Sequence, residues 1–120
     1  MRTMIQANFA SGVDELRATE DVHRLLDRLT VAQDATLVHT ECPDHHVWVG
    51  VRGDRGAMLF TDVITGSWVS LGEGPRQRPR YAGVNFPTHC EIPVADLAVA
   101  IEEFLATGQR PTLVPWQQVR

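Results

Sequence analysis

The sequence contains no lysine, because all 11 of its basic residues are arginine. This absence excludes Schiff-base catalysis and the lysine-containing phosphate-binding loop, since both chemistries need a lysine amine. Only three serines are present, and none lies in a Gly-x-Ser-x-Gly motif or another nucleophile signature. The 11 arginines face 15 acidic residues, and the resulting net charge of −4 argues against a general nucleic-acid binder. Several classes of enzyme are therefore excluded.

Cysteine is scarce, and long apolar runs are absent. Cys42 and Cys90 are too few for a disulfide framework, and we expect both thiols to be reduced. The N-terminus lacks the apolar core of a signal peptide, and no apolar stretch approaches the roughly 20 residues of a membrane span. The sequence therefore predicts a cytoplasmic protein with no membrane or nucleic-acid partner, and it leaves the oligomeric state open.

The order of the apolar patterns predicts the fold. A chain of 120 residues that is 43% apolar and 22% charged is typical of one compact domain. Apolar residues at helical spacing predict a helix over about residues 19–32 and a second over residues 94–106, which Gly108 would cap and Pro111 would end. Between them, alternating apolar residues and glycine-containing turns predict a meander of strands. We therefore expect one α+β domain over residues 1–120, with a largely antiparallel sheet and two main helices.

Two clusters of cysteine, histidine and carboxylate residues raise the question of a metal site. Their members are Glu41, Cys42, Asp44, His45 and His46 in the first cluster, and His89, Cys90 and Glu91 in the second. Cysteine and histidine are good zinc ligands, but adjacent residues on a strand point to opposite faces, and no Cys-x-x-Cys pair is present. We therefore expect no metal and no cofactor. In this interpretation Asp44 and His45 lie in a loop after Pro43, and Cys90 is a small buried hydrophobe.

Two tryptophans in the predicted meander are candidates for partner binding. In the strands expected over residues 46–52 and 67–71, valines alternate onto one face, and we expect Trp48 and Trp68 on the other. With the helices on the valine face, both tryptophans would lie on the open side, joined by Tyr81. An exposed aromatic cluster beside charged residues is typical of a binding hot spot. The alternative is that a helix or loop covers both faces, which would make the tryptophans part of the core.

A short basic loop is the second candidate for partner binding. Arg76, Arg78 and Arg80 lie around Pro75 and Pro79 in a stretch where glycine and proline discourage regular structure. This loop is suited to a carboxylate-rich or phosphate-bearing partner, and the alternative is ordinary solvated charge. The predicted partner surface therefore combines these arginines with the tryptophan face, and no catalytic residue is assigned.

The C-terminal part of the sequence resembles a known family. The residues that carry the resemblance are Gly72-Glu73, Tyr81, Glu91-Ile92-Pro93, Ala98, Glu103-Phe104-Leu105, Thr107-Gly108, Arg110-Pro111 and Trp116. This pattern is similar to the first-numbered immunity-protein family of bacterial polymorphic toxin systems. The resemblance covers residues 72–116 closely and most of the chain loosely, including the layout around Trp48-Val49-Gly50.

The resemblance implies a non-enzymatic α+β protein that binds and neutralises a cognate toxin, often encoded by the neighbouring gene. Toxins linked to this family include nucleic-acid deaminases and nucleases, whose basic clefts an acidic protein approaches with electrostatic help. Two other functions remain open from the residues alone. One is a regulatory or scaffold protein of the same fold without a toxin partner. The other is a small thiol- or metal-dependent enzyme that uses Cys42, Cys90 and nearby histidines.

Overall fold

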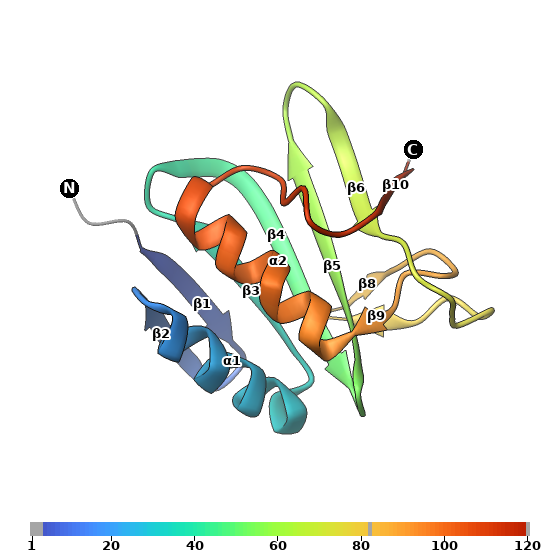
Figure 1. The fold of residues 1–120 in the computed structure, drawn as a ribbon, viewed down its shortest axis with the longest axis horizontal. Helices are drawn as coiled ribbons and strands as arrows, with labels where there is room; N and C mark the ends of the chain where they lie inside the picture. Colours follow the sequence, from blue (N-terminus) through green and yellow to red (C-terminus); the bar gives the residue numbers. More distant parts are fainter. Residues whose placement is uncertain (1–3, 82, 120) are drawn as a thin grey trace.

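Two helices pack on one face of an antiparallel sheet in the computed structural model, which describes residues 4–81 and 83–119 (Figure 1). The helices are α1 (Thr19–Ala32) and α2 (Val94–Thr107). The strands are β1 (Ile5–Phe9), β2 (Gly12–Leu16), β3 (Asp34–His39), β4 (Cys42–Arg52), β5 (Arg55–Asp62), β6 (Gly66–Ser70), β7 (Arg80–Tyr81), β8 (Val84–Asn85), β9 (Ile92–Pro93) and β10 (Trp116–Val119). The expected α+β class with two main helices is confirmed.

The main sheet has the order β10-β6-β5-β4-β3-β1-β2, with β9 paired to the start of β5 and a separate β7–β8 hairpin. All of its pairs are antiparallel, and β3 to β6 form the predicted meander. Strand β2 was not predicted. The prediction of a loop at Asp44 and His45 was wrong, because β4 begins at Cys42 and includes both residues. After a register shift the pairing of β4 with β3 resumes at Cys42 and His39, so the strand continues through these polar residues to Cys42.

We call the helix-covered side of the sheet the front face and the opposite side the back face. The front face carries the larger core, to which strands and helices both contribute buried apolar side chains. Its central members are Val47, Val49, Val51, Met58 and Phe60 from the sheet and Leu97, Ile101, Phe104 and Leu105 from α2. The ring of Phe104 meets that of Phe60 edge-on, with centroids 6.1 Å apart. The predicted apolar stripe of the second helix is therefore confirmed as a packing surface.

Hydrogen bonds define the start of α1 and the end of α2. At the start of α1, Asp21 accepts hydrogen bonds from the backbone N–H groups of Arg17 (2.8 Å) and Ala18 (3.1 Å). These bonds and the guanidinium of Arg24 lower the pKa of the Asp21 carboxyl from its ordinary value. At the end of α2, Gly108 adopts a left-handed conformation with φ of 68°, and its N–H donates to the carbonyl of Phe104 (2.7 Å). The glycine cap is therefore confirmed at the predicted residue.

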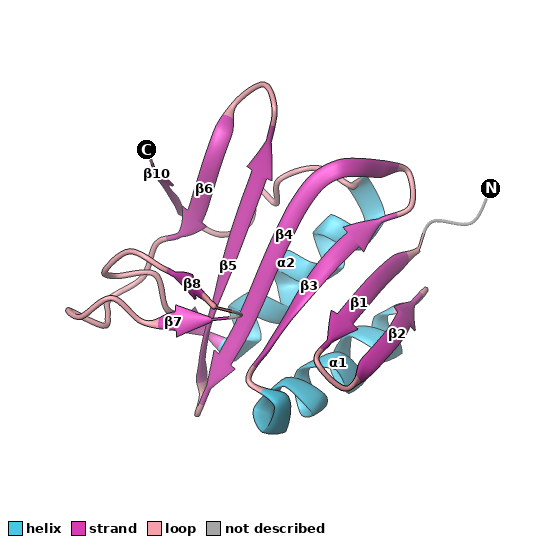
Figure 2. Cartoon of the chain, turned by 180° about the vertical axis from the view of Figure 1, so that it is seen from behind, coloured by secondary structure: helices cyan, strands magenta, loops and turns pink. Residues whose placement is uncertain are grey.

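The segment of residues 72–91, of which residue 82 is not described, folds over the part of the back face formed by β4, β5 and β6 (Figure 2). It contributes Tyr81, Phe86 and Cys90 to a second, smaller core. The ring of Tyr81 lies so close to Gly50 that any Cβ at this position would overlap it. In the described part of the chain, no segment covers the back of β1, β2 and β3 (Figure 2). One end of the back face is therefore covered, and the other is open.

Candidate partner-binding surfaces

The two tryptophans expected to share a face lie on opposite faces of the sheet. Trp48 pairs with Leu59, which in turn pairs with Val69, and directly paired residues point to the same side. Trp48 therefore lies on the back face. Trp68 pairs with Phe60, whose ring belongs to the front-face core, so Trp68 points to the front. The prediction of a shared face was wrong. Alternation shows which side chains of one strand lie on the same face, but the pairing register between strands decides which face of the sheet that is.

Tyr81 is buried, not exposed as predicted, and retains only 4% of its accessible surface. Its hydroxyl donates a hydrogen bond to the carboxylate of Glu91, which also forms an ion pair with Nη2 of Arg52 at 2.9 Å. Burial, together with the bond to Glu91, raises the pKa of Tyr81 well above its ordinary value. The three side chains fasten the segment of residues 72–91 to the back face. Tyr81 is thus an internal residue of this segment and does not join an exposed aromatic cluster.

The three loop arginines are exposed on this same segment. Nη2 of Arg80 donates to the carbonyl of Gly83 at 3.3 Å, whereas Arg76 and Arg78 form no ion pair with another described residue. Water solvates such exposed guanidinium groups, so their lack of a partner has no structural cost. A role of Arg76, Arg78 and Arg80 in partner binding stays a prediction.

Two histidines, His45 of the first cluster and His39 just before it, form hydrogen bonds with the end of α2. The N–H of Glu41 donates to Nδ1 of His39 (3.1 Å), and Nε2 of His39 therefore carries a proton and donates to the carbonyl of Leu105 (3.0 Å). Nδ1 of His45 donates to the carbonyl of Gly108 (2.7 Å). These bonds satisfy carbonyl groups that a helix end leaves without partners. Both histidines thus anchor α2 to the neighbouring strands.

Both cysteines are free, and they differ in burial and in their place in the fold. Cys42 lies beside Gly108 at the end of α2, whereas Cys90 is fully buried in the back-face core. Burial raises the pKa of the Cys90 thiol to about 12, so this thiol is protonated at neutral pH. Within residues 4–81 and 83–119, no three histidine, cysteine or carboxylate side chains come together in a way that would hold a metal ion.

A stack of an arginine on a tryptophan lies on the front face beyond the end of α2. The guanidinium carbon of Arg110 lies 3.9 Å from the ring centroid of Trp68 and 6.0 Å from that of Trp116. The indole N–H of Trp116 donates to the carbonyl of Pro111 at 2.7 Å, which holds the last strand against this corner. Both tryptophans are half-buried, so the stack combines an aromatic surface with a cation. Arg110 was named in the family pattern, but it was not predicted to be a binding residue.

The β5–β6 hairpin carries two exposed aliphatic residues at its tip. Val63 and Ile64 are 88% and 90% exposed, and the loop that holds them projects past the helices at the top of Figure 1. Asp62 accepts hydrogen bonds from the hydroxyl (2.6 Å) and the N–H (2.6 Å) of Thr65 and from the N–H of Ile64 (2.7 Å). These bonds lower the pKa of Asp62 from its ordinary value. The turn at Thr65-Gly66 was predicted, but the exposure of its aliphatic residues was not.

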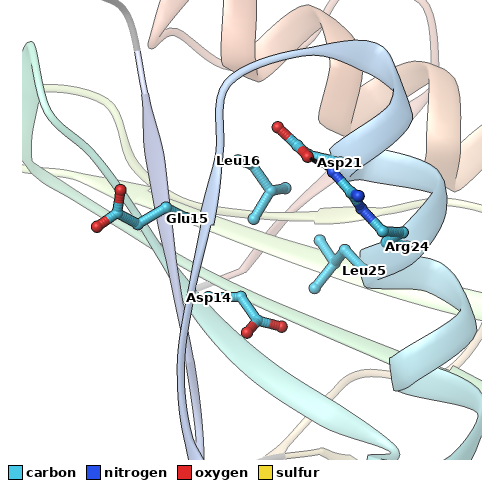
Figure 3. A pocket seen from close by; sticks show the side chains of 6 residues that line it. All are labelled: Asp14, Glu15, Leu16, Asp21, Arg24 and Leu25. Atoms are coloured by element: carbon cyan, nitrogen blue, oxygen red, sulfur yellow. Dashed lines mark hydrogen bonds and ion pairs between the residues drawn. The ribbon is translucent and has the colours of Figure 1, made fainter.

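A pocket of about 260 Å³ lies between β2 and α1 (Figure 3). Its lining consists of Asp14, Glu15, Leu16, Asp21, Arg24 and Leu25. Arg24 pairs with Asp21, Arg28 pairs with Asp14 (2.6 Å), and Glu15 points away from both Asp21 and Arg24. The charged residues that line the pocket thus form ion pairs within the chain, Glu15 with Arg17 among them, and leave no unpaired set of charges for a small ligand.

One protein family matches most of the chain. Residues 12–118 match the family model described as immunity protein Imm1, from β2 through β10. The chain belongs to the Imm1 immunity-protein family. A search of curated proteins found no match. The resemblance inferred from residues 72–116 is thus confirmed, and it extends over nearly the whole Imm1 domain.

Membership of Imm1 indicates a toxin-neutralising immunity function. Several residues that carried the resemblance have structural roles in this Imm1 protein: Tyr81 and Glu91 fasten the back segment, Phe104 fills the front core, and Gly108 caps α2. None of the helices described is both long and apolar enough to cross a membrane. These four residues of the family pattern therefore maintain the fold, whereas Arg110, which also belongs to the pattern, is half-exposed beside Trp68.

Proposed function

We propose that this Imm1 protein binds the toxin encoded beside it and neutralises that toxin by occluding its surface in a one-to-one complex. The family match over residues 12–118 carries this proposal. Neutralisation by occlusion requires a stable domain with exposed anchor residues, and it requires no catalytic group. The reactive side chains support this interpretation, because His39 and His45 bind helix carbonyls and the Cys90 thiol is buried in its protonated form.

A toxin that acts on nucleic acid, such as a deaminase or a nuclease, is the proposed partner class. Enzymes that bind nucleic acid carry arginine and lysine around their clefts to neutralise phosphates. The Imm1 protein has a net charge of −4, and its first 50 residues combine four arginines with eight carboxylates, a difference of −4. Opposite charge increases the rate of association and orients the encounter, while short-range contacts determine the affinity.

The two tryptophans mark alternative contact surfaces on opposite faces. Trp48 is half-buried on the back face, where the ring of His46 lies with its centroid 6.1 Å away, and the loop arginines belong to the same side. Trp68 lies on the front face with Arg110 above its ring. We favour the Trp68 side, because it combines the exposed tip of the β5–β6 hairpin with a cation that has no counter-charge in the described chain.

Reconstitution with the toxin domain from the adjacent gene tests the proposed function. Purified Imm1 protein is titrated into that domain, binding is measured by calorimetry, and growth of cells that express the toxin is compared with and without the Imm1 protein. We expect one-to-one stoichiometry and restored growth. An unrelated toxin domain is the specificity control. Persistent growth arrest with folded Imm1 protein in excess, together with no heat of binding, would falsify the proposal.

A further inference from the structure

We infer that the tip of the β5–β6 hairpin and the Arg110–Trp68 stack form one docking surface for an apolar patch of the toxin that presents a carboxylate. This hairpin surface consists of Val63, Ile64, Trp68 and Arg110. The inference rests on the proposed toxin-binding function and goes beyond it by assigning the surface and the chemistry of the partner. Its basis is the combination of exposed apolar area, a rigid loop and an unpaired cation.

Val63 and Ile64 are the two most exposed large hydrophobic residues in the described part of the chain. Because they are adjacent in one turn, they present a single apolar projection rather than two scattered side chains. A tip of this kind gains free energy when it enters an apolar pocket of another protein, since water is then removed from both surfaces. The shape of the hairpin therefore favours insertion into a partner.

The turn is held in one conformation by side-chain hydrogen bonds. Asp62 bonds the backbone of Ile64 and Thr65, while Nε1 of Trp68 donates to Oγ1 of Thr65 at 3.2 Å. From the neighbouring strand β10, Nε2 of Gln118 donates to the carbonyl of Thr65, also at 3.2 Å. A loop that is ordered before binding loses less conformational entropy in the complex. The exposed tip is thus presented as a preorganised element.

Arg110 supplies the charge that defines the partner. Its Nη1 atom is the only buried side-chain nitrogen or oxygen without a hydrogen-bond partner among the described residues. By contrast, Arg28 and Arg52 each pair with a carboxylate of this chain, Asp14 and Glu91 respectively. Nη1 is itself enclosed, but the Arg110 side chain as a whole is half-exposed and forms no ion pair with a described carboxylate, so its accessible part can form charge-assisted bonds with a carboxylate from outside. The partner atom facing Arg110 is therefore a carboxylate oxygen of an aspartate or glutamate.

Trp68 joins the tip to the cation. Its indole N–H bonds the turn at Thr65, and its ring face carries the guanidinium of Arg110. Stacking restricts the orientation of the guanidinium, whose planar fork matches the geometry of a carboxylate. Tryptophan and arginine are enriched at the energetic centres of interfaces, where they are surrounded by apolar contacts. The hairpin surface has this composition and arrangement.

Affinities of single variants for the purified toxin domain test the inference. Ile64→Asp and Arg110→Gln should each weaken binding about thirtyfold or more, the loss expected of an interface anchor. The matched controls are Val31→Asp, which alters an 85% exposed valine on α1, and Arg17→Gln, which alters an exposed arginine just before α1. Both controls should bind like the parent chain. Circular dichroism and melting temperature establish that each variant is folded at the temperature of the measurement.

Two further variants test the carboxylate. Arg110→Lys retains the charge but loses the planar fork, and it should bind more weakly than the parent and more tightly than Arg110→Gln. Raising the salt concentration should weaken the parent complex more than the Arg110→Gln complex. If Arg110→Gln and Arg110→Lys bind like the parent, the partner carboxylate is excluded.

The outcomes separate this inference from the proposed function. If the parent chain does not bind the toxin domain, the proposed function itself fails. If the parent binds and both Ile64→Asp and Arg110→Gln bind equally well, the function stands and the hairpin surface is not the interface. Equal weakening by Val31→Asp would also overturn the inference, because the loss would then not be specific to the hairpin. Selective loss in the two hairpin-surface variants supports it.

Discussion

The front and back faces of the sheet are covered by different means. On the front, the apolar faces of helices α1 and α2 pack against the strands and form a core of many fully buried side chains. On the back, one segment of residues 72–91 contributes a few apolar side chains and is fastened by the buried contact of Tyr81, Glu91 and Arg52. Periodic burial therefore stabilises the front, whereas a small number of specific polar contacts stabilises the back.

This difference has consequences for stability and for binding. A helix stripe distributes its free energy over many side chains, so the loss of one of them leaves most of the packing intact. A segment held by one polar cluster depends on each member of that cluster, because the remaining groups stay buried without partners when one is removed. We therefore expect changes on the front to lower global stability, and changes on the back to release residues 72–91 locally.

The largest effect is expected at the centre of the front face. Phe104 is fully buried between the rings of Phe60 and His39, with centroids at 6.1 and 5.5 Å. Phe104→Ala should lower the free energy of unfolding by about 3–5 kcal/mol, the cost of deleting a buried ring and leaving a cavity. Urea denaturation measures this change. An unfolding midpoint equal to that of the parent would show that α2 does not depend on this ring.

A smaller and more local effect is expected from Glu91→Ala on the back face. The substitution leaves the Tyr81 hydroxyl and the Arg52 guanidinium without their shared acceptor, at a cost of about 2–3 kcal/mol. Hydrogen exchange should become faster at the Phe86 amide, which donates to the Pro79 carbonyl within the back segment. Uniformly faster exchange in α1 as well would contradict a local release. Glu73→Ala, at an exposed residue of the same segment, is the control.

The two tryptophans extend the comparison to binding. Trp68→Ala should weaken the toxin complex by about 2 kcal/mol, because it removes the support of both Arg110 and Thr65. Trp48→Ala on the back face should leave the affinity close to that of the parent. Calorimetry with folded variants measures both values. The reverse result, in which only Trp48→Ala loses affinity, would assign the interface to the back face.

The sequence predicted those parts of the fold that depend on local patterns. The apolar stripe of α2, its end at Gly108 and the meander of β3 to β6 follow from helical spacing, turn residues and alternation. It did not predict β2, whose residues Asp14 and Glu15 interrupt any apolar alternation and which forms by pairing with β1. β2 is a strand because it pairs with β1, and short-range sequence patterns carry no information about such pairing.

The candidate site was predicted only in part for the same reason. Trp68 was selected as a binding residue, and it remains one in the proposal, but its face was wrong because the register between β5 and β6 was unknown. Tyr81 was selected as exposed and is buried, since Gly50 allows its ring to lie against the sheet. Arg110 was not selected, because its unpaired state depends on which carboxylates lie near it in three dimensions.

The smallest effect on stability is expected at Asp62, and it depends on pH. Hydrogen bonds from Thr65 and Ile64 favour the ionised carboxylate and lower its pKa below the ordinary value of 3.8. A lowered pKa in the folded state means that the contribution of Asp62 is present above about pH 4 and is lost as the pH falls through the folded-state pKa. Asp62→Asn should therefore be slightly less stable than the parent at pH 7, and this difference should shrink as the pH falls below about 4. Parallel thermal melts at several pH values measure it, with Asp44→Asn on the exposed surface of β4 as the control. A difference between parent and Asp62→Asn that stays constant from pH 7 to pH 3 would show that the charge of Asp62 does not hold the hairpin tip.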